Sequence, residues 1–285
     1  MRFRGKLVDI TCIQHFTRVV TTISKLIKTC VLRITPTALY LILSEKVVNG
    51  GVQIWCELPQ GHFFDEYAME GVSAEENEIY LELAPENLVK ALKTAQTAKW
   101  VKVKLTKKHA PCITIEVDLP TLGAHSRVVV HDIPVSVVPR RLWTEYQEPE
   151  VPNFDVSIVM PQIKVLKNVI EKMKNLSNTL LLSANHQGEF KVSVETDMVS
   201  VSTHFQDLLN PASGNGGAPQ QLNPSMDPEE FAEVRIDIRR FAQFLSGQQV
   251  SPNRVICNIV DNKVVHFYLM NDDVSLQYFM PVMVV

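Results

Sequence analysis

The sequence lacks several features that mark common classes of protein. Its 285 residues include only five cysteines, and these are scattered without a C-x-x-C pair, so neither a disulfide framework nor a cysteine zinc site is indicated. No apolar run approaches the roughly 18–20 residues that a membrane span needs, and the residues after Met1 show no signal-peptide pattern. These absences predict an intracellular protein with reduced thiols and no membrane partner.

The sequence motifs of nucleotide-binding and hydrolytic enzymes are also missing. There is no Walker loop, no G-x-G-x-x-G, no H-E-x-x-H and no G-x-S-x-G. The nearest approach to catalytic or metal-ligand spacing is the pair His131 and Asp132 and the group His62, Asp65 and Glu66. A metal-dependent nuclease built on these residues stays as an alternative, but ordinary surface polarity is the simpler interpretation. We predict no catalytic residue, no metal site and no cofactor.

An excess of positive charge is absent as well. The 28 basic and 31 acidic residues give a net charge of −3, which at first argues against a nucleic-acid partner. Four expected helices, however, together carry 11 basic and 4 acidic residues, against 17 and 27 in the rest of the chain. Glutamate favours helices as much as lysine does, so helix propensity does not predict this bias. The pattern indicates a positive helical face that follows phosphates, on a molecule whose outside repels DNA.

The order of the expected elements indicates an internal duplication. The four helices are expected at 9–29, 85–98, 161–178 and 237–249, from apolar residues that recur every three or four positions, with Pro161 in the first turn of the third helix. Each follows a strand-like segment and precedes alternating strands, and each pattern recurs about 150 residues later. The expected strands include 30–34, 39–43, 78–83, 101–105, 112–118, 179–183, 189–195, 233–238, 254–260 and 263–270. We therefore predict an α+β fold of two duplicated domains, each with two helices packed on antiparallel sheets.

The domains are expected at 1–138 and 154–285, with a connector at 139–153 between them. Three prolines and the lack of periodicity predict that this connector is extended. Trp143 and Tyr146 lie on it, where large aromatic side chains either anchor a partner peptide or fold back onto their own domain. A stretch at about 210–230, rich in Pro, Gly, Asn and Gln, predicts a flexible loop in the second domain.

Four segments carry a resemblance to a known family. They are MEGVSA at 69–74, KALKTA at 90–95, HDIPV at 131–135 and DVSLQYFMP at 273–281. In combination they strongly resemble the Hus subunits of the checkpoint sliding clamp, relatives of PCNA, and the likeness covers nearly the whole chain. The resemblance implies a PCNA-like fold and a ring of three subunits, with helices lining the hole and sheets outside.

The resemblance also implies three sets of site residues. The DNA-facing positions are His15, Arg18, Lys25, Lys90, Lys93, Lys167, Lys174, Arg239 and Arg240. Subunit interfaces are expected on edge strands at 112–118 and 198–205, through Ile113, Ile115, Val117, Val199, Val201 and Thr203. The partner-binding positions are Leu142, Trp143, Tyr146, Val151 and Phe279. Gln14 and Thr21 stand where PCNA relatives often carry lysine, so the first helix is expected to contribute less charge.

The function implied by the resemblance is that of a non-enzymatic subunit of a heterotrimeric DNA clamp. Its partners would be Rad-nine-type and Rad-one-type subunits, an ATP-driven clamp loader, double-stranded DNA bound without sequence preference, and repair enzymes that dock on the connector. The ring would act near damage in the nucleus, with the free chain also in the cytoplasm, and would support checkpoint signalling and repair. A homotrimeric replicative processivity clamp remains the alternative.

Overall fold

The computed structural model describes residues 1–44, 51–121, 127–211, 226–247, 254–271 and 274–283. Most of the loop predicted at about 210–230 therefore lies outside the described residues. The chain forms two compact units, the first mainly from residues 1–43 and 55–147 and the second mainly from residues 148–247 and 254–283. The division after residue 147 falls inside the segment predicted as the connector.

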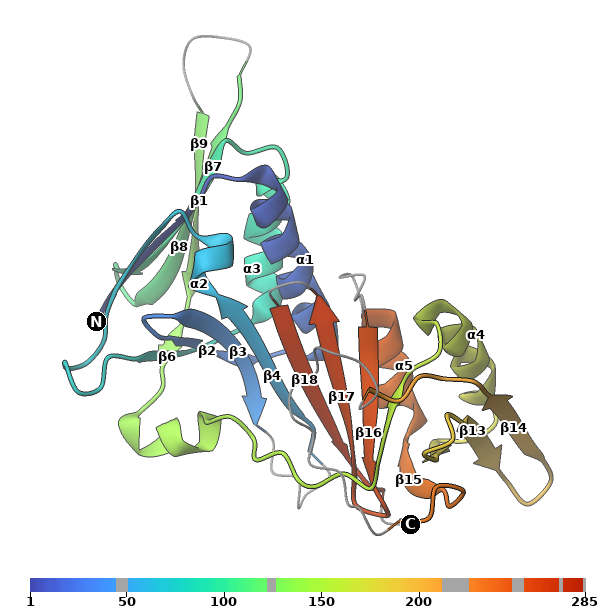
Figure 1. Cartoon of the computed structure of the whole chain (residues 1–285). Helices are drawn as coiled ribbons and strands as arrows, with labels where there is room; N and C mark the ends of the chain where they lie inside the picture. Colours follow the sequence, from blue (N-terminus) through green and yellow to red (C-terminus); the bar gives the residue numbers. More distant parts are fainter. Residues whose placement is uncertain (45–50, 122–126, 212–225, 248–253, 272–273, 284–285) are drawn as a thin grey trace. The chain divides into compact units, whose positions relative to one another are not determined.

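The first unit contains two antiparallel sheets and two main helices (Figure 1). One sheet has the strand order β5-β1-β7-β8-β9, and the other has the order β10-β6-β2-β3-β4. In chain order the elements are β1 (Arg2–Leu7), α1 (Ile10–Leu26), β2 (Cys30–Ile34), β3 (Ala38–Ser44), β4 (Gln53–Pro59), α2 (Gln60–Phe63), β5 (Glu66–Glu70), β6 (Ile79–Leu83), α3 (Pro85–Leu92), the 3-10 helix η2 (Lys93–Ala95), β7 (Trp100–Lys107), β8 (Pro111–Leu119), β9 (Arg127–Pro134), β10 (Ser136–Val137) and the 3-10 helix η3 (Arg140–Tyr146).

The second unit repeats this plan. Its elements are β11 (Val156–Val159), α4 (Ile163–Met173), β12 (Thr179–Ala184), β13 (Phe190–Glu195), β14 (Ser200–Phe205), β15 (Ala232–Asp237), α5 (Ile238–Gly247), β16 (Arg254–Val260), β17 (Val264–Asn271) and β18 (Val274–Pro281). The order β11-β16-β17-β18 matches β1-β7-β8-β9 of the first unit, and β15-β12-β13-β14 matches β6-β2-β3-β4. The matching strand orders confirm the predicted duplication and the α+β class.

The local sequence determines where helix α1 begins and which of its faces is buried. The Asp9 carboxylate accepts hydrogen bonds from the backbone N–H groups of Thr11 and Cys12, at 2.6 and 3.1 Å, and so caps the start of the helix. Hydrogen bonds from the Thr11 side chain and from these backbone groups lower the pKa of the Asp9 carboxyl. Ile13 and Ile23, on the apolar stripe that the periodicity predicted, are fully buried in the unit.

Helix α4 is shorter than predicted. Pro161 precedes the helix instead of lying in its first turn. After Met173 the chain leaves the helix through tighter bonds, from Asn175 N–H to the Lys172 carbonyl at 3.3 Å and from Leu176 N–H to the Met173 carbonyl at 2.9 Å. The apolar spacing continues past the point where these bonds end the α-helix, which explains why periodicity alone extended it.

β12 and β13 form a hairpin. The Asn185 side-chain oxygen accepts the N–H groups of Gln187 and Glu189, both at 3.1 Å. Gly188 has φ of +85°, and a Cβ atom there would lie 2.4 Å from the Leu208 carbonyl oxygen. Only glycine fits this turn without displacing the neighbouring backbone.

Each unit buries its own core. In the second unit an aromatic stack fills the space between α5 and its sheet, and the rings of Phe244 and Phe267 lie 4.8 Å apart at 28°. All five cysteines are free thiols; Cys30, Cys56, Cys112 and Cys257 are buried, while Cys12 is half-buried. Burial raises the pKa of the Cys30 thiol to about 12.

Candidate DNA-facing helices, sheet edges and connector

The exposed face of α1 carries cations, but His15 is not among them. Arg18 and Lys25 are exposed, and Lys28, which was not predicted to face DNA, is exposed just after the end of the helix. His15 is only 8% exposed, and its Nδ1 lies 3.4 Å from Nε2 of His62. The prediction that His15 faces DNA is wrong, because its ring is packed against α2 on the buried side of the helix. Because α1 ends at Leu26, helical spacing does not place Lys28 on the same face as Lys25.

Lys90 and Lys93 both project into solvent from the second helical segment of the first unit. Lys90 lies on α3 and Lys93 on η2, three positions apart. The Lys90 ammonium lies 2.9 Å from the carboxylate of Glu86, one turn earlier. The hydrogen bond from Lys90 lowers the pKa of the Glu86 carboxyl. The predicted lysine pair is therefore accessible, and part of its charge is balanced on the same helix.

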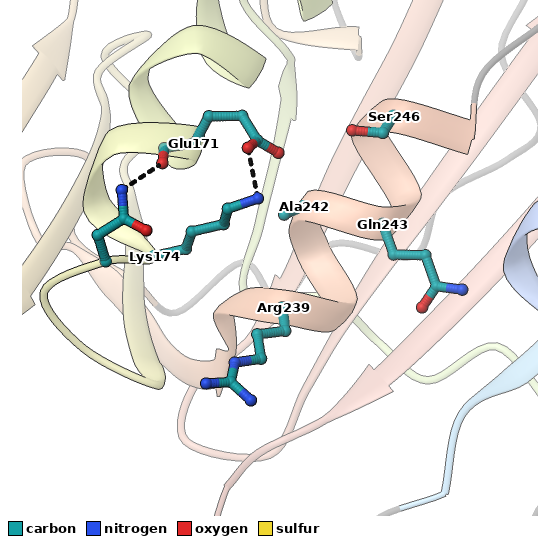
Figure 2. A pocket seen from close by; sticks show the side chains of 7 residues that line it. Glu171, Lys174, Arg239, Ala242, Gln243 and Ser246 are labelled. Atoms are coloured by element: carbon teal, nitrogen blue, oxygen red, sulfur yellow. Dashed lines mark hydrogen bonds and ion pairs between the residues drawn. The ribbon is translucent and has the colours of Figure 1, made fainter.

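The cations of the second unit lie on α4 and α5. Lys167 and Lys174 are half-exposed, and the Lys174 ammonium forms an ion pair with Glu171. Arg239 is exposed at the start of α5, whereas Arg240 is half-buried, because residues one apart on a helix point about 100° from each other. Lys174 and Arg239 line a hollow of about 460 Å³ between the two helices, and Figure 2 shows both side chains. Arg240 is not one of its lining residues.

The predicted interface strand at 112–118 is not an edge. It forms β8, which is hydrogen-bonded to β7 on one side and to β9 on the other. Ile113, Ile115 and Val117 are completely buried in the core of the first unit. These three residues are therefore not available to a second subunit, and the prediction is corrected.

One outer strand of this sheet is β9, which lies at the opposite end of the order β5-β1-β7-β8-β9 from β5, and its Val128 and Val130 are 46% and 53% exposed. In the second unit β14 is an outer strand of the sheet β14-β13-β12-β15, as predicted. Val201 and Thr203 lie on it and are half-exposed, whereas the exposed Val199 lies in the turn before the strand. Each unit thus includes an outer strand, β9 or β14, that is suited to pairing with another chain.

The first half of the connector is not extended. Residues 140–146 form η3, and the side chains of Leu142, Trp143 and Tyr146 are half-buried against the cluster of Val31, Tyr80 and Val138. Of the two alternatives for Trp143 and Tyr146, the structure shows the one in which they fold back onto their own domain. The predicted partner-binding role of these three side chains therefore requires that they first leave this site.

The other two predicted partner-binding residues differ from each other. Val151 is 47% exposed in the second half of the connector. Phe279 is 4% exposed, because β18 places it against the buried ring of His266, at a centroid distance of 4.2 Å. Phe279 is a core residue of the second unit, and the prediction that it contacts a partner is wrong.

The residues considered for a nuclease are occupied by structural contacts. Asp65 accepts the backbone N–H of Val8 at 2.7 Å. Asp132 accepts hydrogen bonds from Lys108 and Thr114, which lower the pKa of its carboxyl. Within the described ranges, no group of three His, Cys, Asp or Glu side chains is placed to hold a metal ion. The helices in those ranges also include none long and apolar enough to cross a membrane.

Comparison with known proteins decides the family. Residues 1–284 match the family model described as Hus1-like protein. The chain belongs to the Hus1-like family. The human protein named Checkpoint protein HUS1 is 55% identical over 281 residues, which cover 99% of both chains. Checkpoint protein Hus1-like from Drosophila melanogaster is 27% identical, with 99% of each chain covered, and checkpoint protein hus1 from Schizosaccharomyces pombe is 29% identical, with 95% and 94% covered.

Solved structures establish the fold of this Hus1-like chain. PCNA from Entamoeba histolytica superposes with a TM-score of 0.71 at 10% identity, covering 99% of each chain. PCNA from Thermococcus kodakaraensis gives 0.65 at 15% identity, covering 98% of this chain and 99% of the other. The predicted α+β sliding-clamp fold and the resemblance to Hus subunits are confirmed. Family and fold are those of non-enzymatic checkpoint clamp scaffolds, so the prediction that the chain is not an enzyme is confirmed as well.

Proposed function

We propose that this Hus1-like chain is one subunit of a heterotrimeric ring that encircles double-stranded DNA at sites of damage. The observation that carries the proposal is a sliding-clamp fold whose main helices expose Arg18, Lys25, Lys90, Lys93 and Arg239, in a chain of net charge −3. A chain that is negative overall but positive on its helices suits a ring that admits DNA only where those helices face.

The exposed cations suit loose contact with phosphates. Lys and Arg side chains attract the backbone of any sequence, and phosphate contacts carry no base information by themselves. Lys90 and Lys174 each have an acidic partner on the same helix, which leaves only part of their charge for DNA. Such a surface holds DNA in the ring and still allows movement along it.

Assembly through sheet edges follows from the free strands of the two units. β9 of one subunit and β14 of another expose the backbone groups that a neighbouring strand pairs with. In this proposal β9 takes the place of the strand at 112–118, and the partners are Rad-nine-type and Rad-one-type subunits. The two clamp domains are 1–138 and 154–285, joined by the connector at 139–153.

The remaining parts of the proposal rest on the family resemblance. An ATP-driven clamp loader places the ring on DNA, and the ring supports checkpoint signalling and serves as a platform for repair enzymes that dock on the connector. The exposed Val151 in the second half of the connector is available for such docking. The ring acts in the nucleus, and the free chain is also present in the cytoplasm.

The mass of the purified chain tests the heterotrimer against a self-assembling replicative clamp. The chain alone should be measured by native mass spectrometry and by size-exclusion chromatography with light scattering, and then again with the two partner types. We expect no stable homotrimer and a complex with one copy of each subunit. A stable homotrimer formed by this chain alone would overturn the checkpoint assignment and favour the replicative clamp.

A further inference from the structure

The exposed face of the sheet β5-β1-β7-β8-β9 carries four cations on its neighbouring strands β1 and β7. On β1, Arg4 and Lys6 alternate with buried residues, and on β7 Lys102 and Lys104 do the same. The register places Arg4 opposite Lys104 and Lys6 opposite Lys102. These four residues form the cation block, which is two rows of two side chains on strands about 4.8 Å apart.

The cation block works against the stability of the sheet. Like charges directly opposite each other on neighbouring strands are destabilising, and the block contains two such pairs in succession. Outside the four expected helices the chain has 17 basic and 27 acidic residues, so a cluster of cations contrasts with its surroundings. The packing of the sheet does not require these side chains, because they point away from its buried residues. A binding function accounts for their arrangement.

Glu66 on β5 is shared by the two cations of β1. Its carboxylate lies 2.9 Å from the Lys6 ammonium and 3.4 Å from the Arg4 guanidinium. The hydrogen bond from Lys6 and the charges of Lys6, Arg4 and Lys102 lower the pKa of the Glu66 carboxyl. The Arg4 and Glu66 side chains are 54% and 49% exposed, and an ion pair this exposed contributes little net stability. A carboxylate from another molecule therefore displaces Glu66 from Arg4 at little cost.

The two cations of β7 differ in how far they are neutralised. The Lys104 ammonium lies 2.7 Å from both carboxylate oxygens of Glu116 on β8. The Lys102 ammonium lies 4.3 Å from the ring centroid of Trp100, and no carboxylate of the described residues forms an ion pair with it. Four cations and two carboxylates leave the block with a net charge of +2.

The shape of the block restricts what it fits. Glu66 borders it on the β5 side and Glu116 on the β8 side, so the cations occupy a width of only two strands. Alternate residues of an extended chain lie about 6.6 Å apart, which is also the spacing between the two cations of each strand. Double-stranded DNA is broader, since its major groove alone is about 12 Å wide, and its phosphates would also face the bordering carboxylates. An extended segment with carboxylates at alternate positions therefore fits better than DNA.

We propose that the cation block is a docking site for an extended acidic segment of a partner protein, with Asp or Glu at alternate positions. The segment lies along β1 and β7, pairs with Lys102 and displaces Glu66 from Arg4. The negative charge that it brings removes the repulsion within the two like-charged pairs. The site is separate from the helical cations proposed to face DNA, because all four of its residues lie on strands.

Fluorescence anisotropy of labelled ligands measures binding to the full-length chain at 0.1 M salt, where charges more than about 10 Å apart are largely screened. One ligand is a short peptide in which Glu alternates with Ser. The second peptide has the same composition with all its Glu residues in one run, and the third ligand is a short DNA duplex. The comparison of the two peptides tests the spacing, and the duplex tests the class of ligand.

The test variant is Arg4→Gln combined with Lys102→Gln, which removes one cation from each row and leaves each bordering acid with a lysine. The matched control, Lys99→Gln combined with Lys107→Gln, loses the same charge at exposed lysines outside the block. Thermal melting verifies the fold, and the test variant should not melt below the wild type, because it loses one member of each like-charged pair. If it does, Lys102→Gln alone replaces it in the comparison.

We expect the alternating peptide to bind the wild type more tightly than the other two ligands do. The test variant should weaken this binding about threefold to tenfold, the effect of two lost exposed charge contacts. The control variant should change it less than about twofold, because its lysines lie outside the block. Glu66→Gln should tighten it about twofold, because the competing carboxylate is gone.

Four results would contradict the proposal. Equal losses in the test and control variants would show that only the total charge matters, and equal affinity for the two peptides would overturn the alternate spacing. The absence of peptide binding to the wild type would overturn the site as a whole. Tighter binding of the duplex than of the peptide, lost in the test variant, would make DNA the ligand in place of a protein segment.

Discussion

The indole ring of Trp143 stacks on the phenol ring of Tyr80, with centroids 4.5 Å apart and an interplanar angle of 25°. The indole N–H also donates to the Val138 carbonyl at 3.1 Å, and the Gln147 amide donates to the Tyr80 hydroxyl at 3.0 Å. These contacts make η3 a part of the first unit. A partner that docks beneath the connector must therefore displace the chain's own tryptophan.

Replacing Trp143 should destabilise the first unit. Trp143→Ala removes a half-buried ring and its hydrogen bond, and we expect the free energy of unfolding to fall by about 2 kcal/mol, below the range for a fully buried aromatic residue. Trp143→Phe keeps the stacking and loses only the hydrogen bond, with an expected loss of about 1 kcal/mol. Urea unfolding of the purified chain measures both. Equal stability of Trp143→Ala and the wild type would show that η3 is not seated on Tyr80 in solution.

β8 is buried and paired on both sides, whereas β9 is an exposed outer strand, so substitutions on the two strands should have different effects. Ile115→Ala creates a cavity in a fully buried position of β8 and should lower the free energy of unfolding by about 3 kcal/mol. Val130→Lys adds a charge to the exposed edge strand β9 and should change stability by less than about 0.5 kcal/mol. It should, however, weaken assembly with a partner subunit, because a lysine on an edge strand opposes strand addition.

Urea unfolding measures the stability of Ile115→Ala and Val130→Lys, and native mass spectrometry of the mixed subunits measures their assembly. Thr203→Lys on β14 is the corresponding change at the other free edge. If Val130→Lys and Thr203→Lys both assemble like the wild type, subunits do not join through these strands. If Ile115→Ala is as stable as the wild type, the packing of β8 beneath the helices is wrong.

Charge reversal on the second helical segment tests the DNA-facing surface. Lys90→Glu combined with Lys93→Glu should weaken retention of the ring on DNA and flatten the slope of log K against log salt by about 1.8, the value for two lost phosphate contacts. We expect assembly to be unaffected, because neither lysine lies on β9 or β14, the strands proposed to join the subunits. A matched control reverses Lys99 and Lys263, which are exposed outside the helices. Identical slopes for the two double variants would contradict the assignment of this surface.

The buried imidazole of His266 should make stability depend on pH. Burial lowers the pKa of His266 to about 3 because the charged ring loses its solvation. The ring lies between Phe154 and Phe279, and its Nδ1 is 3.1 Å from the Asn258 amide nitrogen. Between pH 6.5 and about 3 the unfolded chain binds a proton that the folded chain does not, so this group lowers stability as the pH falls, by up to about 1.4 kcal/mol per pH unit.

The variant His266→Gln has a side chain that does not titrate. Its free energy of unfolding should therefore fall less steeply than that of the wild type from pH 6.5 downward, while above pH 6.5 the two profiles should run parallel. Urea unfolding at a series of pH values gives both curves. Parallel profiles over the whole acid range would show that His266 keeps an ordinary pKa in the folded chain.

The sequence by itself determined the elements and their repetition. Strand β2 has the predicted bounds, and α1 begins after Asp9, because a capping carboxylate and apolar spacing are local signals. The recurrence of the pattern about 150 residues later predicted the duplication that the two matching sheet orders show. The excess of basic residues on the expected helices predicted a positive helical face, and the family resemblance implied Arg18, Lys90 and Arg239 as positions on it.

Only the tertiary structure decided which of these elements are covered. β8 and β9 are both rich in β-branched residues, so nothing local shows that β9 pairs with β8 and removes it from the edge. His15 and Trp143 are polar or amphipathic side chains, which the pattern places on a surface, yet His62 and Tyr80 from distant segments bury them. Periodicity tells which side of an element is apolar; what packs against the other side depends on contacts between residues far apart in the chain, and these form only when the whole unit folds.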